Sequence, residues 1–440
     1  MIKVGMISLG CPKNQVDAEI LLKTLEDGGF TLTNREDDAD VIIVNTCGFL
    51  ESAAEEAIEA ILEAASYKEA GVLKALIVTG CLAERYKDDI SEEIPEVDVV
   101  VGLGSNKDIV QIVNDALKGK KENHFGNKLD LPLCGNRVLT TPNYLAYLKI
   151  AEGCSNCCSY CAIPSIRGRF RSREMSDILK EATVLAQNGV KELVVIAQDT
   201  TRYGEDLYGK PQLAKLLREL CKIDGLEIIR TLYTYPDRID DELIAVVYEE
   251  EKLAKYFDIP IQHSEDHILK AMNRRTTKAE LIELIKKLRK EIPDVAIRTT
   301  LITGFPGETE EDFTNLAEFV VNTKFDKLGC FPYSAEEGTV AAKMENQVEL
   351  QKRYDRAENI MNEQIDIAAE KNAAKIGKTF KCITEGYDGG LKAYYGRTMY
   401  DAPEIDGKVF FASKEKLNPG DIVNVVINDY IEYDLLGEKV

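Results

Sequence analysis

The first hundred residues alternate short apolar runs with amphipathic stretches, and this alternation constrains the fold more than any other feature. The apolar runs, rich in Val and Ile, cover residues 2–10, 40–46, 74–80 and 97–104. Such runs are typical of strands that are buried on both faces of a parallel sheet. Helical patterns such as 14–28 and 51–68 separate them. Strands that alternate with helices predict a parallel-sheet α/β domain, which we assign to residues 1–125.

The first three runs end alike, because a cysteine follows each of them. SLGCPKN contains Cys11, VNTCGF contains Cys47 and VTGCLAE contains Cys81. Ligands of open α/β sheets gather at the carboxyl ends of the strands, so we expect the three thiols to converge. A single cysteine there would be an ordinary small core residue, but three equivalent positions favour a shared cluster or metal ion. Gly10 and Gly80 allow the backbone to approach such a group closely.

A second region of strands and helices follows a stretch rich in Gly, Pro and Asn, which we interpret as a linker at 126–140. Six apolar runs cover residues 145–151, 192–197, 226–233, 256–261, 295–303 and 325–333. Helical stretches separate them, and a long polar helix is expected at 347–372. Six β–α repeats predict a partial (β/α)6 barrel at 141–372. Sites in such barrels lie on the loops at the carboxyl ends of the strands.

The sequence GCSNCCSYC directly follows the first of these six runs. Two CxxC pairs, Cys154/Cys157 and Cys158/Cys161, offer the four ligands that tetrahedral zinc takes, but the pairs abut without a spacer. The other spacing, CxxxCxxC, uses Cys154, Cys158 and Cys161. Three thiolates on a 4Fe–4S cluster leave one iron without a protein ligand, and an open iron can bind a substrate-like molecule.

Composition limits the location and the partners of the chain. There are eleven cysteines, no uncharged apolar segment long enough to span a membrane and no signal peptide, so we expect a cytoplasmic protein. Thiols stay reduced there, which favours metal binding or catalysis over disulfides. The formal net charge of −21 disfavours non-specific binding of nucleic acid and suits a basic partner, although acidity can also serve solubility alone.

The last part of the chain has a different pattern. Short alternating runs with turns at DGG, DGK and NPG predict a small antiparallel β-barrel at 373–440. Residues 378–440 hold eight Lys and Arg against eleven Asp and Glu, a net charge of −3. The segment GRTMYDAPEIDG carries Asp401, Glu404 and Asp406. We expect an acidic face there, which would repel phosphate and attract a basic protein.

The cysteine motifs resemble a known family. CxxxCxxC after the first strand of a partial barrel resembles the signature of radical S-adenosylmethionine enzymes, and GCSNCCSYCAIPSIRGRFRSR is similar to their methylthiotransferase branch. By this resemblance Cys157, where a basic or polar residue is commoner, is the spare thiol. The resemblance covers essentially the whole chain: the N-terminal domain resembles the methylthiotransferase domain and the tail resembles a TRAM domain. SLGCPKN and DAPEIDG resemble the RimO branch, which modifies a ribosomal protein.

The resemblance implies methylthiolation of the β-carbon of an aspartate in small-subunit ribosomal protein S-12, free or in the assembling subunit. It implies two 4Fe–4S clusters and S-adenosylmethionine as cofactors, with an electron donor and a sulfur source as partners and no membrane. Cys154, Cys158 and Cys161 would hold the cluster that cleaves S-adenosylmethionine, and a second molecule of it would supply the methyl group. The second cluster, which supplies or carries the sulfur, would be held by Cys11, Cys47 and Cys81.

Two alternatives use the same residues. Methylthiolation of a modified adenosine in tRNA has the same chemistry, but tRNA is not the expected partner because the tail is acidic. A non-enzymatic iron–sulfur or zinc protein, such as a scaffold or sensor, is the second alternative, and bound metal identity separates it from the enzyme.

The remaining motifs leave several interpretations open, and no side chain is assigned as a catalytic acid or base because the clusters carry the chemistry. Gln198 and Asp199 follow a strand and are candidates for binding S-adenosylmethionine. Gly304 and Glu308, in GFPGET, are candidates for the adenosine pocket, but the turn can equally be a helix start capped by Thr309. We weigh His263 between general base and packing. The basic run of Arg167, Arg169, Arg171 and Arg173 is interpreted by default as a solvated face.

Overall fold

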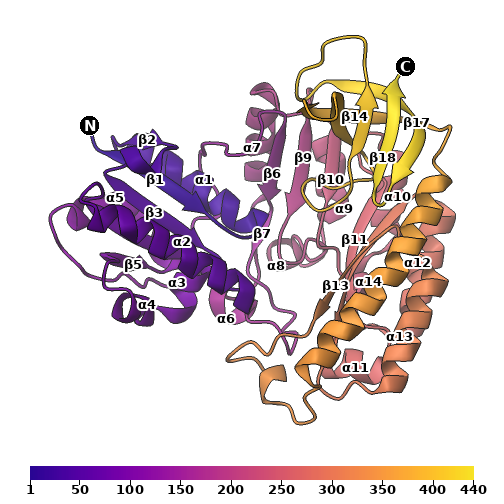
Figure 1. Ribbon diagram of the computed structural model, residues 1–440, viewed down its shortest axis with the longest axis horizontal. Coiled ribbons are helices and arrows are strands. Elements are labelled where there is room, and N and C mark those ends of the chain that lie inside the picture. The colour runs from indigo at the N-terminus through magenta and orange to yellow at the C-terminus, as the bar shows by residue number, and fades with distance from the viewer.

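The N-terminal part of the chain is a five-stranded parallel sheet in the order β2-β1-β3-β4-β5, seen at the left of Figure 1 in the computed structural model, which describes residues 1–440. Its strands are β1 (Lys3–Ser8), β2 (Thr31–Thr33), β3 (Val41–Thr46), β4 (Ala75–Gly80) and β5 (Val99–Val101). All residues of β3 and β4 are buried, as their apolar sequences require on a sheet covered on both faces. The predicted parallel-sheet domain is confirmed. The edge strand β2 was not predicted, because a segment of three residues is too short to show the alternation of apolar and polar residues that marks a strand.

Helices cover both faces of this sheet. They are α1 (Pro12–Asp27), α2 (Glu51–Glu69), α3 (Cys81–Tyr86), α4 (Asp88–Glu93) and α5 (Ile109–Ala116), with 3-10 turns η1 (Glu36–Asp38), η2 (Leu103–Asp108) and η3 (Lys128–Asp130). The apolar side chains of the sheet divide into two buried clusters, one on each face. The covered sheet therefore fixes the loops that leave its carboxyl edge.

Six parallel strands form the centre of the molecule, one in each predicted apolar run. They are β6 (Leu145–Lys149), β9 (Glu192–Ile196), β10 (Ile228–Thr231), β11 (Tyr256–Gln262), β12 (Ala296–Thr303) and β13 (Lys327–Pro332). The predicted partial barrel is present as two three-stranded sheets, β10-β9-β6 and β11-β12-β13. They meet where the Thr234 backbone N–H donates to the Asp258 carbonyl at 2.9 Å.

Helices line the outside of these strands, as Figure 1 shows. The longer ones are α7 (Met175–Gln187), α9 (Leu213–Cys221), α10 (Asp241–Glu249), α12 (Lys278–Glu291), α13 (Glu310–Thr323) and α14 (Leu350–Ala373), the last being the predicted polar helix. The short elements are β7 (Ala151–Glu152), α6 (Ile163–Arg167), β8 (Arg171–Ser172), α8 (Glu205–Tyr208), η4 (Pro236–Arg238), α11 (Asp266–Ala271) and η5 (Ala341–Lys343). None of these helices, nor any other in the chain, has the length and apolar character needed to cross a membrane.

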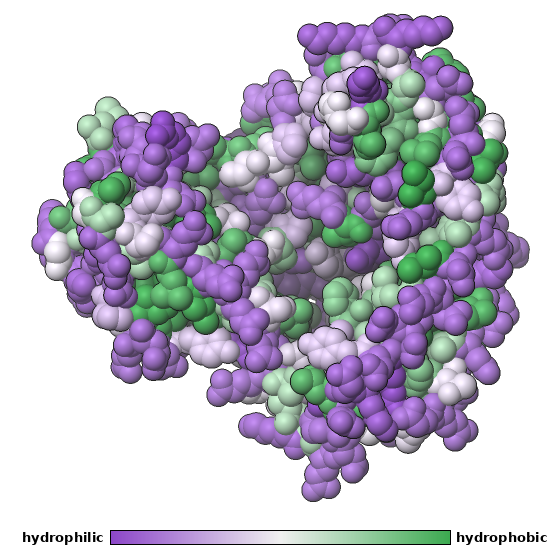
Figure 2. Space-filling view, viewed as in Figure 1, coloured by the Kyte–Doolittle hydropathy of each residue, from purple (hydrophilic) through white to green (hydrophobic).

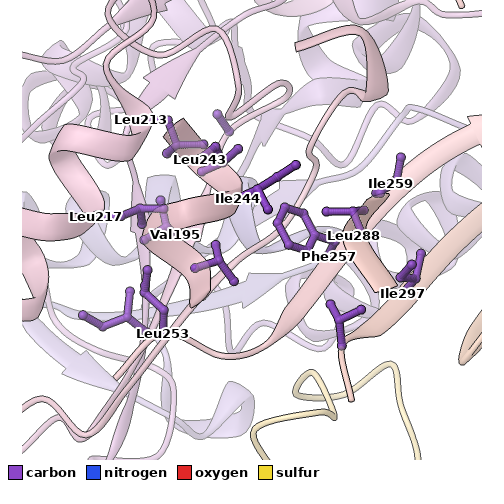
Figure 3. Packing of buried hydrophobic residues seen from close by; sticks show 14 of the residues in the cluster. Val195, Leu213, Leu217, Leu243, Ile244, Leu253, Phe257, Ile259, Leu288 and Ile297 are labelled. Carbon is purple, nitrogen blue, oxygen red and sulfur yellow. The ribbon is translucent and has the colours of Figure 1, made fainter. Parts of the chain in front are cut away.

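The main hydrophobic core lies between the central strands and their outer helices and contains 47 buried residues. Figure 3 shows Val195, Phe257 and Ile297 from the strands facing helix residues such as Leu217 and Leu288. Each large apolar side chain that is fully buried stabilises the fold by roughly 1.5–3 kcal/mol. This core is the rigid support from which the loops at the carboxyl ends of the strands project.

The C-terminal part is a closed five-stranded barrel in the order β14-β15-β16-β18-β17. Its strands are β14 (Thr379–Asp388), β15 (Ala393–Thr398), β16 (Val409–Ala412), β17 (Ile422–Ile431) and β18 (Asp434–Lys439). The predicted barrel is confirmed, with one difference: β16 and β18 pair in parallel. The hairpin of β17 and β18 returns the chain in the direction of β16, which an apolar pattern alone does not specify.

The C-terminal barrel covers the amino ends of the central strands (Figure 1). Asp401 pairs with Lys327 of β13 at 2.8 Å, and Asp406 accepts a hydrogen bond from the Tyr256 hydroxyl at 2.7 Å. The side chains of these two aspartates are only 5% and 2% exposed. The predicted acidic face is therefore wrong at both residues, because they neutralise cations at the strand ends. Glu404 lies at the surface, and its carboxylate accepts from the Tyr147 hydroxyl at 3.2 Å.

Candidate active site at the domain junction

Three cysteines follow three neighbouring strands of the N-terminal sheet. Cys11 is the N-cap of α1, Cys47 follows β3, and Cys81 begins α3 directly after β4. The turns that carry them depend on glycine: Gly10 has a φ of +89°, and a Cβ built there would lie 2.5 Å from the Cys47 Cβ. Only glycine lets the Cys11 turn lie this close to Cys47. We refer to Cys11, Cys47 and Cys81 as the N-terminal trio.

Arg167 reaches the N-terminal trio from the central part of the chain. Its Nε donates to the Cys81 Sγ at 3.3 Å. Burial raises the pKa of Cys81 to about 12 and holds the pKa of Cys47 above its ordinary value. Burial acts in the same direction on Cys11, but the positive charges of Lys13 and Arg167 outweigh it and lower the pKa of that thiol. The site therefore favours negative charge at Cys11.

The second set of cysteines lies on the loop after β7. Cys154 and Cys158 are buried and Cys161 is half-buried, whereas Cys157 is exposed and has a φ of +52°. The Cys158 Sγ lies 3.5 Å from the Tyr235 hydroxyl and 3.9 Å from Nη1 of Arg274, and the Arg274 guanidinium stacks on the Tyr235 ring at 4.2 Å. Two side chains thus orient one thiol. We refer to Cys154, Cys158 and Cys161 as the loop trio.

Neither trio is gathered around the position of a single metal ion. Zinc in a structural site takes four ligand atoms at about 2.0–2.3 Å. No group of three or more Cys, His, Asp or Glu residues in the structure is gathered in a way that holds one ion. In a 4Fe–4S cluster each thiolate binds its own iron, so the three cysteines of a trio need not converge on one ion. The zinc interpretation of the paired CxxC motifs therefore lacks geometric support.

A buried ion-pair network connects the two trios. Nη1 of Arg167 lies 2.9 Å from Asp17 of α1 and 3.0 Å from Glu152 of β7. Lys149 of β6 pairs with the same two carboxylates, at 2.8 Å in the case of Glu152. All four side chains are at most 1% exposed. Because Glu152 lies two residues before Cys154, the network extends from Cys81 to the start of the cysteine loop.

The basic run that contains Arg167 is therefore not a solvated face throughout. Arg167 and Arg173 are buried, whereas Arg169 is exposed and Arg171 is intermediate. Arg173 donates to the Lys149 carbonyl at 2.7 Å and pairs with Glu181 at 2.6 Å. The default interpretation is wrong for these two residues. Their carboxylate partners, Asp17, Glu152 and Glu181, all lie outside the basic run, so the charge pattern within the run gave no signal of them.

Gln198 and Asp199 lie beside the loop trio. Asp199 is buried and accepts from the Asn156 side chain at 2.8 Å, and burial raises its pKa. The Gln198 amide donates to Glu152 at 3.0 Å, while its Oε1 is buried without a partner. An unpaired buried acceptor costs about 1–3 kcal/mol, which makes this atom a candidate for binding a ligand.

Gly304 and Glu308 lie in one turn between β12 and α13. The Glu308 carboxylate accepts from the Gly304 backbone N–H at 2.8 Å and pairs with Arg356 of α14 at 2.7 Å. His263 is fully buried, and its Nε2 lies 3.4 Å from Glu308. The turn continues into α13, which Thr309 caps as predicted. Glu308 therefore braces the turn, and its carboxylate is fully engaged within the protein.

The chain matches three family models. Residues 3–102 match uncharacterized protein family UPF0004, residues 148–320 match the radical SAM superfamily and residues 376–440 match the TRAM domain.

Among solved structures, TsrM, a radical S-adenosylmethionine methyltransferase from Kitasatospora setae, has a TM-score of 0.58 at 14% identity. The similarity covers 75% of this chain and 74% of that chain. The cobalamin-dependent S-adenosylmethionine radical enzyme OxsB has a TM-score of 0.52, again at 14% identity, over 82% of this chain and 56% of its own. At this identity the likeness concerns the fold alone.

Curated relatives match over the full length. A "Ribosomal protein uS12 methylthiotransferase RimO" from Thermoanaerobacter sp. is 49% identical over 439 residues, covering 100% of both chains. A protein of the same name from Desulforamulus reducens is 51% identical over 442 residues, covering 100% of this chain and 99% of its own. These matches extend over the N-terminal sheet, the central strands and the C-terminal barrel. The chain belongs to the RimO family of radical S-adenosylmethionine methylthiotransferases.

Proposed function

We propose that the chain transfers a methylthio group to the β-carbon of an aspartate in small-subunit ribosomal protein S-12, free or in the assembling subunit. The observation that carries the proposal is the buried link between Cys81 of the N-terminal trio and Glu152, which lies two residues before the loop trio. Arg167 makes this link through its contacts with both residues. The relatives that carry the uS12 name match the whole chain and support this substrate.

In this proposal the loop trio holds a 4Fe–4S cluster with one open iron, and the N-terminal trio holds a second cluster for the sulfur. With S-adenosylmethionine bound, the first cluster supplies radical chemistry that can remove a hydrogen from carbon. Tyr235 and Arg274 fix the Cys158 thiol. Cys157 faces outward and stays outside the set of ligands.

S-adenosylmethionine would lie between two walls of the central region. On one wall, the free Gln198 Oε1 is an acceptor for a donor group of the cofactor, and Asp199 lies beside it. On the other wall, Gly304 offers a backbone surface that Glu308 braces from behind. A Cβ at Gly304 would collide with Arg353 of α14. The chain's part is to orient the cofactor and to exclude water.

The proposal includes an electron donor, a sulfur source and a location in the cytoplasm. None of the eleven cysteines forms a disulfide. Reduced thiols in this number suit a compartment where glutathione and thioredoxin keep them reduced.

Mass spectrometry of cells with and without this gene tests the proposal. We expect the methylthio mass on an aspartate of protein S-12 to disappear from the deletion strain and to return on complementation. Digested tRNA from the same cultures is the internal comparison and should not change. Loss of a methylthio nucleoside from tRNA, with S-12 unchanged, would assign the chemistry to the alternative substrate.

A further inference from the structure

A short segment between β13 and α14 connects the central strands to the N-terminal part of the chain. Residues 333–341 form this segment, which we call the strap. Both of its ends are fixed in the central region: the Tyr333 N–H donates to the Thr303 carbonyl at 2.8 Å, and the Ala341 N–H donates to the Ser159 carbonyl at 2.8 Å. Between these ends the strap, orange in Figure 1, extends toward the N-terminal part.

Glu336, in the middle of the strap, makes the contact with the N-terminal part. The residue is 6% exposed. Its carboxylate pairs with Nη1 of Arg85 at 2.8 Å and accepts from the Glu51 backbone N–H at 3.2 Å. The Ser334 hydroxyl donates to the same carboxylate at 2.7 Å. A buried carboxylate is stable when it is paired and hydrogen-bonded in this way, so these partners hold Glu336 in one position.

Arg85 binds two further groups besides Glu336. Its Nη1 donates to the carbonyl of Gly48, the residue after Cys47, at 2.9 Å, and its Nη2 donates to the Glu337 carbonyl of the strap at 3.1 Å. The planar guanidinium presents several donors in a fixed geometry. Ion pairs at an exposed surface contribute little to stability, but the Arg85 side chain is only 10% exposed. We call Glu336 and Arg85 the strap pair.

The strap connects the turns that carry the two cysteine trios. On the N-terminal side, Arg85 lies one helical turn after Cys81 in α3. On the central side, Ser159 directly follows Cys158 of the loop trio. These contacts use other side chains than the ion network of Arg167. The two trios are therefore connected through the protein in two separate ways.

The strap also borders the space between the two parts. Figure 2 shows that the molecule is hollowed between the N-terminal part and the central strands, and in the same view in Figure 1 the strap lies on the lower side of this hollow. A substrate side chain that is modified at both trios must lie between them. The strap limits how far the two parts can separate around it.

We propose that Glu336 and Arg85 are positioning residues, which hold the turns of the two trios at the spacing that sulfur transfer requires. This inference rests on the proposed function, in which the loop trio activates the substrate carbon and the N-terminal trio provides the sulfur. Neither residue of the strap pair touches the substrate. A misplacement of about 1 Å can lower a rate by about 100-fold. Without the strap pair, cofactor cleavage continues, but the activated carbon meets the sulfur less often.

The yield of methylthio product per 5′-deoxyadenosine tests the inference. It is measured with purified S-12 and the intact, cluster-loaded protein under anaerobic conditions. We expect Glu336→Ala to keep cleaving the cofactor and to lower this yield by about tenfold or more. Arg85→Ala should have a similar effect, and the double variant should be no worse than either single variant, because the two side chains act through one contact. Glu336→Gln, whose amide oxygen still accepts hydrogen bonds, should restore part of the yield.

Amide hydrogen exchange gives a second readout that does not depend on activity. The Glu51 N–H donates to the Glu336 side chain. We expect Glu336→Ala to speed exchange in the peptide that contains the Glu51 amide and in the strap, and to leave the strands of the central core unchanged. Faster exchange at both places shows that the strap has been released.

Glu337→Ala is the matched control, because Glu337 is the next residue, is exposed and contacts Arg85 through its backbone carbonyl alone. It removes the same charge and should keep the wild-type yield and exchange. Iron content per chain shows whether each variant loads its clusters, and Glu336→Gln replaces Glu336→Ala if the latter does not.

Three results would overturn the inference. The first is an unchanged yield in the iron-loaded Glu336 variant. The second is a fall of cofactor cleavage and methylthio transfer by the same factor, which would make the strap pair a general support of the fold. The third is a lower yield without faster exchange, which would give Glu336 a role other than holding the strap. Failure of the proposed function is distinguishable, because wild type would then leave S-12 unmodified.

Discussion

Arg167 is the residue through which the two halves of the site interact. It contacts a thiol of the N-terminal trio and two buried carboxylates from α1 and β7. Removing one partner from a buried ion network leaves charges uncompensated, which typically costs 3–5 kcal/mol. We expect Arg167→Ala to lower the free energy of unfolding by about 3 kcal/mol or more in anaerobic urea titrations, and exposed Arg169→Ala to change it by less than about 0.5 kcal/mol. Equal effects of the two substitutions would contradict the proposed role of the network.

Cys157 and Cys158 are adjacent but differ in burial and contacts. Cys158 is buried against Tyr235 and Arg274, while Cys157 is exposed. We expect Cys158→Ala to abolish reductive cleavage of S-adenosylmethionine and Cys157→Ala to leave it near the wild-type rate. The measurement is 5′-deoxyadenosine formation by the reduced protein. Cleavage that persists in Cys158→Ala would refute the assignment of the loop trio.

The two trios are proposed to have different roles, cofactor cleavage at the loop trio and sulfur transfer at the N-terminal trio. Cys47 belongs to the N-terminal trio and lies outside the cysteine loop. We expect Cys47→Ala to stop thiolation of S-12 while cofactor cleavage continues. Parallel assays of 5′-deoxyadenosine and of the methylthio product check this. If cleavage stops as well, the two clusters do not act separately.

At the scale of elements, the turn after β1 decides whether the N-terminal trio can form. Gly10 and Gly29 have nearly the same φ, +89° and +88°, but a Cβ at Gly10 meets Cys47 whereas one at Gly29 meets nothing within 4 Å. A left-handed conformation costs an alanine about 1–2 kcal/mol, so both substitutions carry that cost. Only Gly10→Ala should also displace Cys47 and reduce bound iron by about half. Iron analysis of the two variants checks this, and equal iron contents would contradict it.

At the scale of the whole molecule, the C-terminal barrel is held to the central strands by buried ion pairs. Glu192 of β9 pairs with Arg397 of β15 at 2.6 Å and with Arg230 of β10 at 3.2 Å. Burial alone would raise the pKa of Glu192, but the two arginines outweigh it and hold the pKa below its ordinary value of 4.5. A lowered folded-state pKa contributes stability above the ordinary value, and this contribution is lost as the pH falls through the folded value.

The lowered pKa of Glu192 predicts how the stability of the protein depends on pH. We expect Glu192→Gln to be less stable than wild type at about pH 7 and the difference to shrink as the pH is lowered below about 4.5. Paired urea titrations at several pH values measure the difference directly. A difference that is constant with pH would show that the Glu192 charge does not hold the barrel in place.

Much of the fold follows from local sequence. The apolar runs specified the parallel strands because strands buried on both faces must be apolar throughout, and the positions of Cys11, Cys47 and Cys81 after strands implied a common edge. The spacing of the loop cysteines allowed both a paired CxxC and a CxxxCxxC interpretation, and only the resemblance to a known family set Cys157 apart.

Only the tertiary structure decided what the charged residues do. The sequence cannot tell that Asp401 and Asp406 face inward, that Arg167 is buried against Asp17 or that Lys13 lies over Tyr233, because each partner is tens to hundreds of residues away. Hydrophobic periodicity is a property of neighbouring residues, and it determines which segments form strands and helices. The partner of a charge depends on how those segments pack, since a charge is stabilised by whatever group lies within a few ångströms of it.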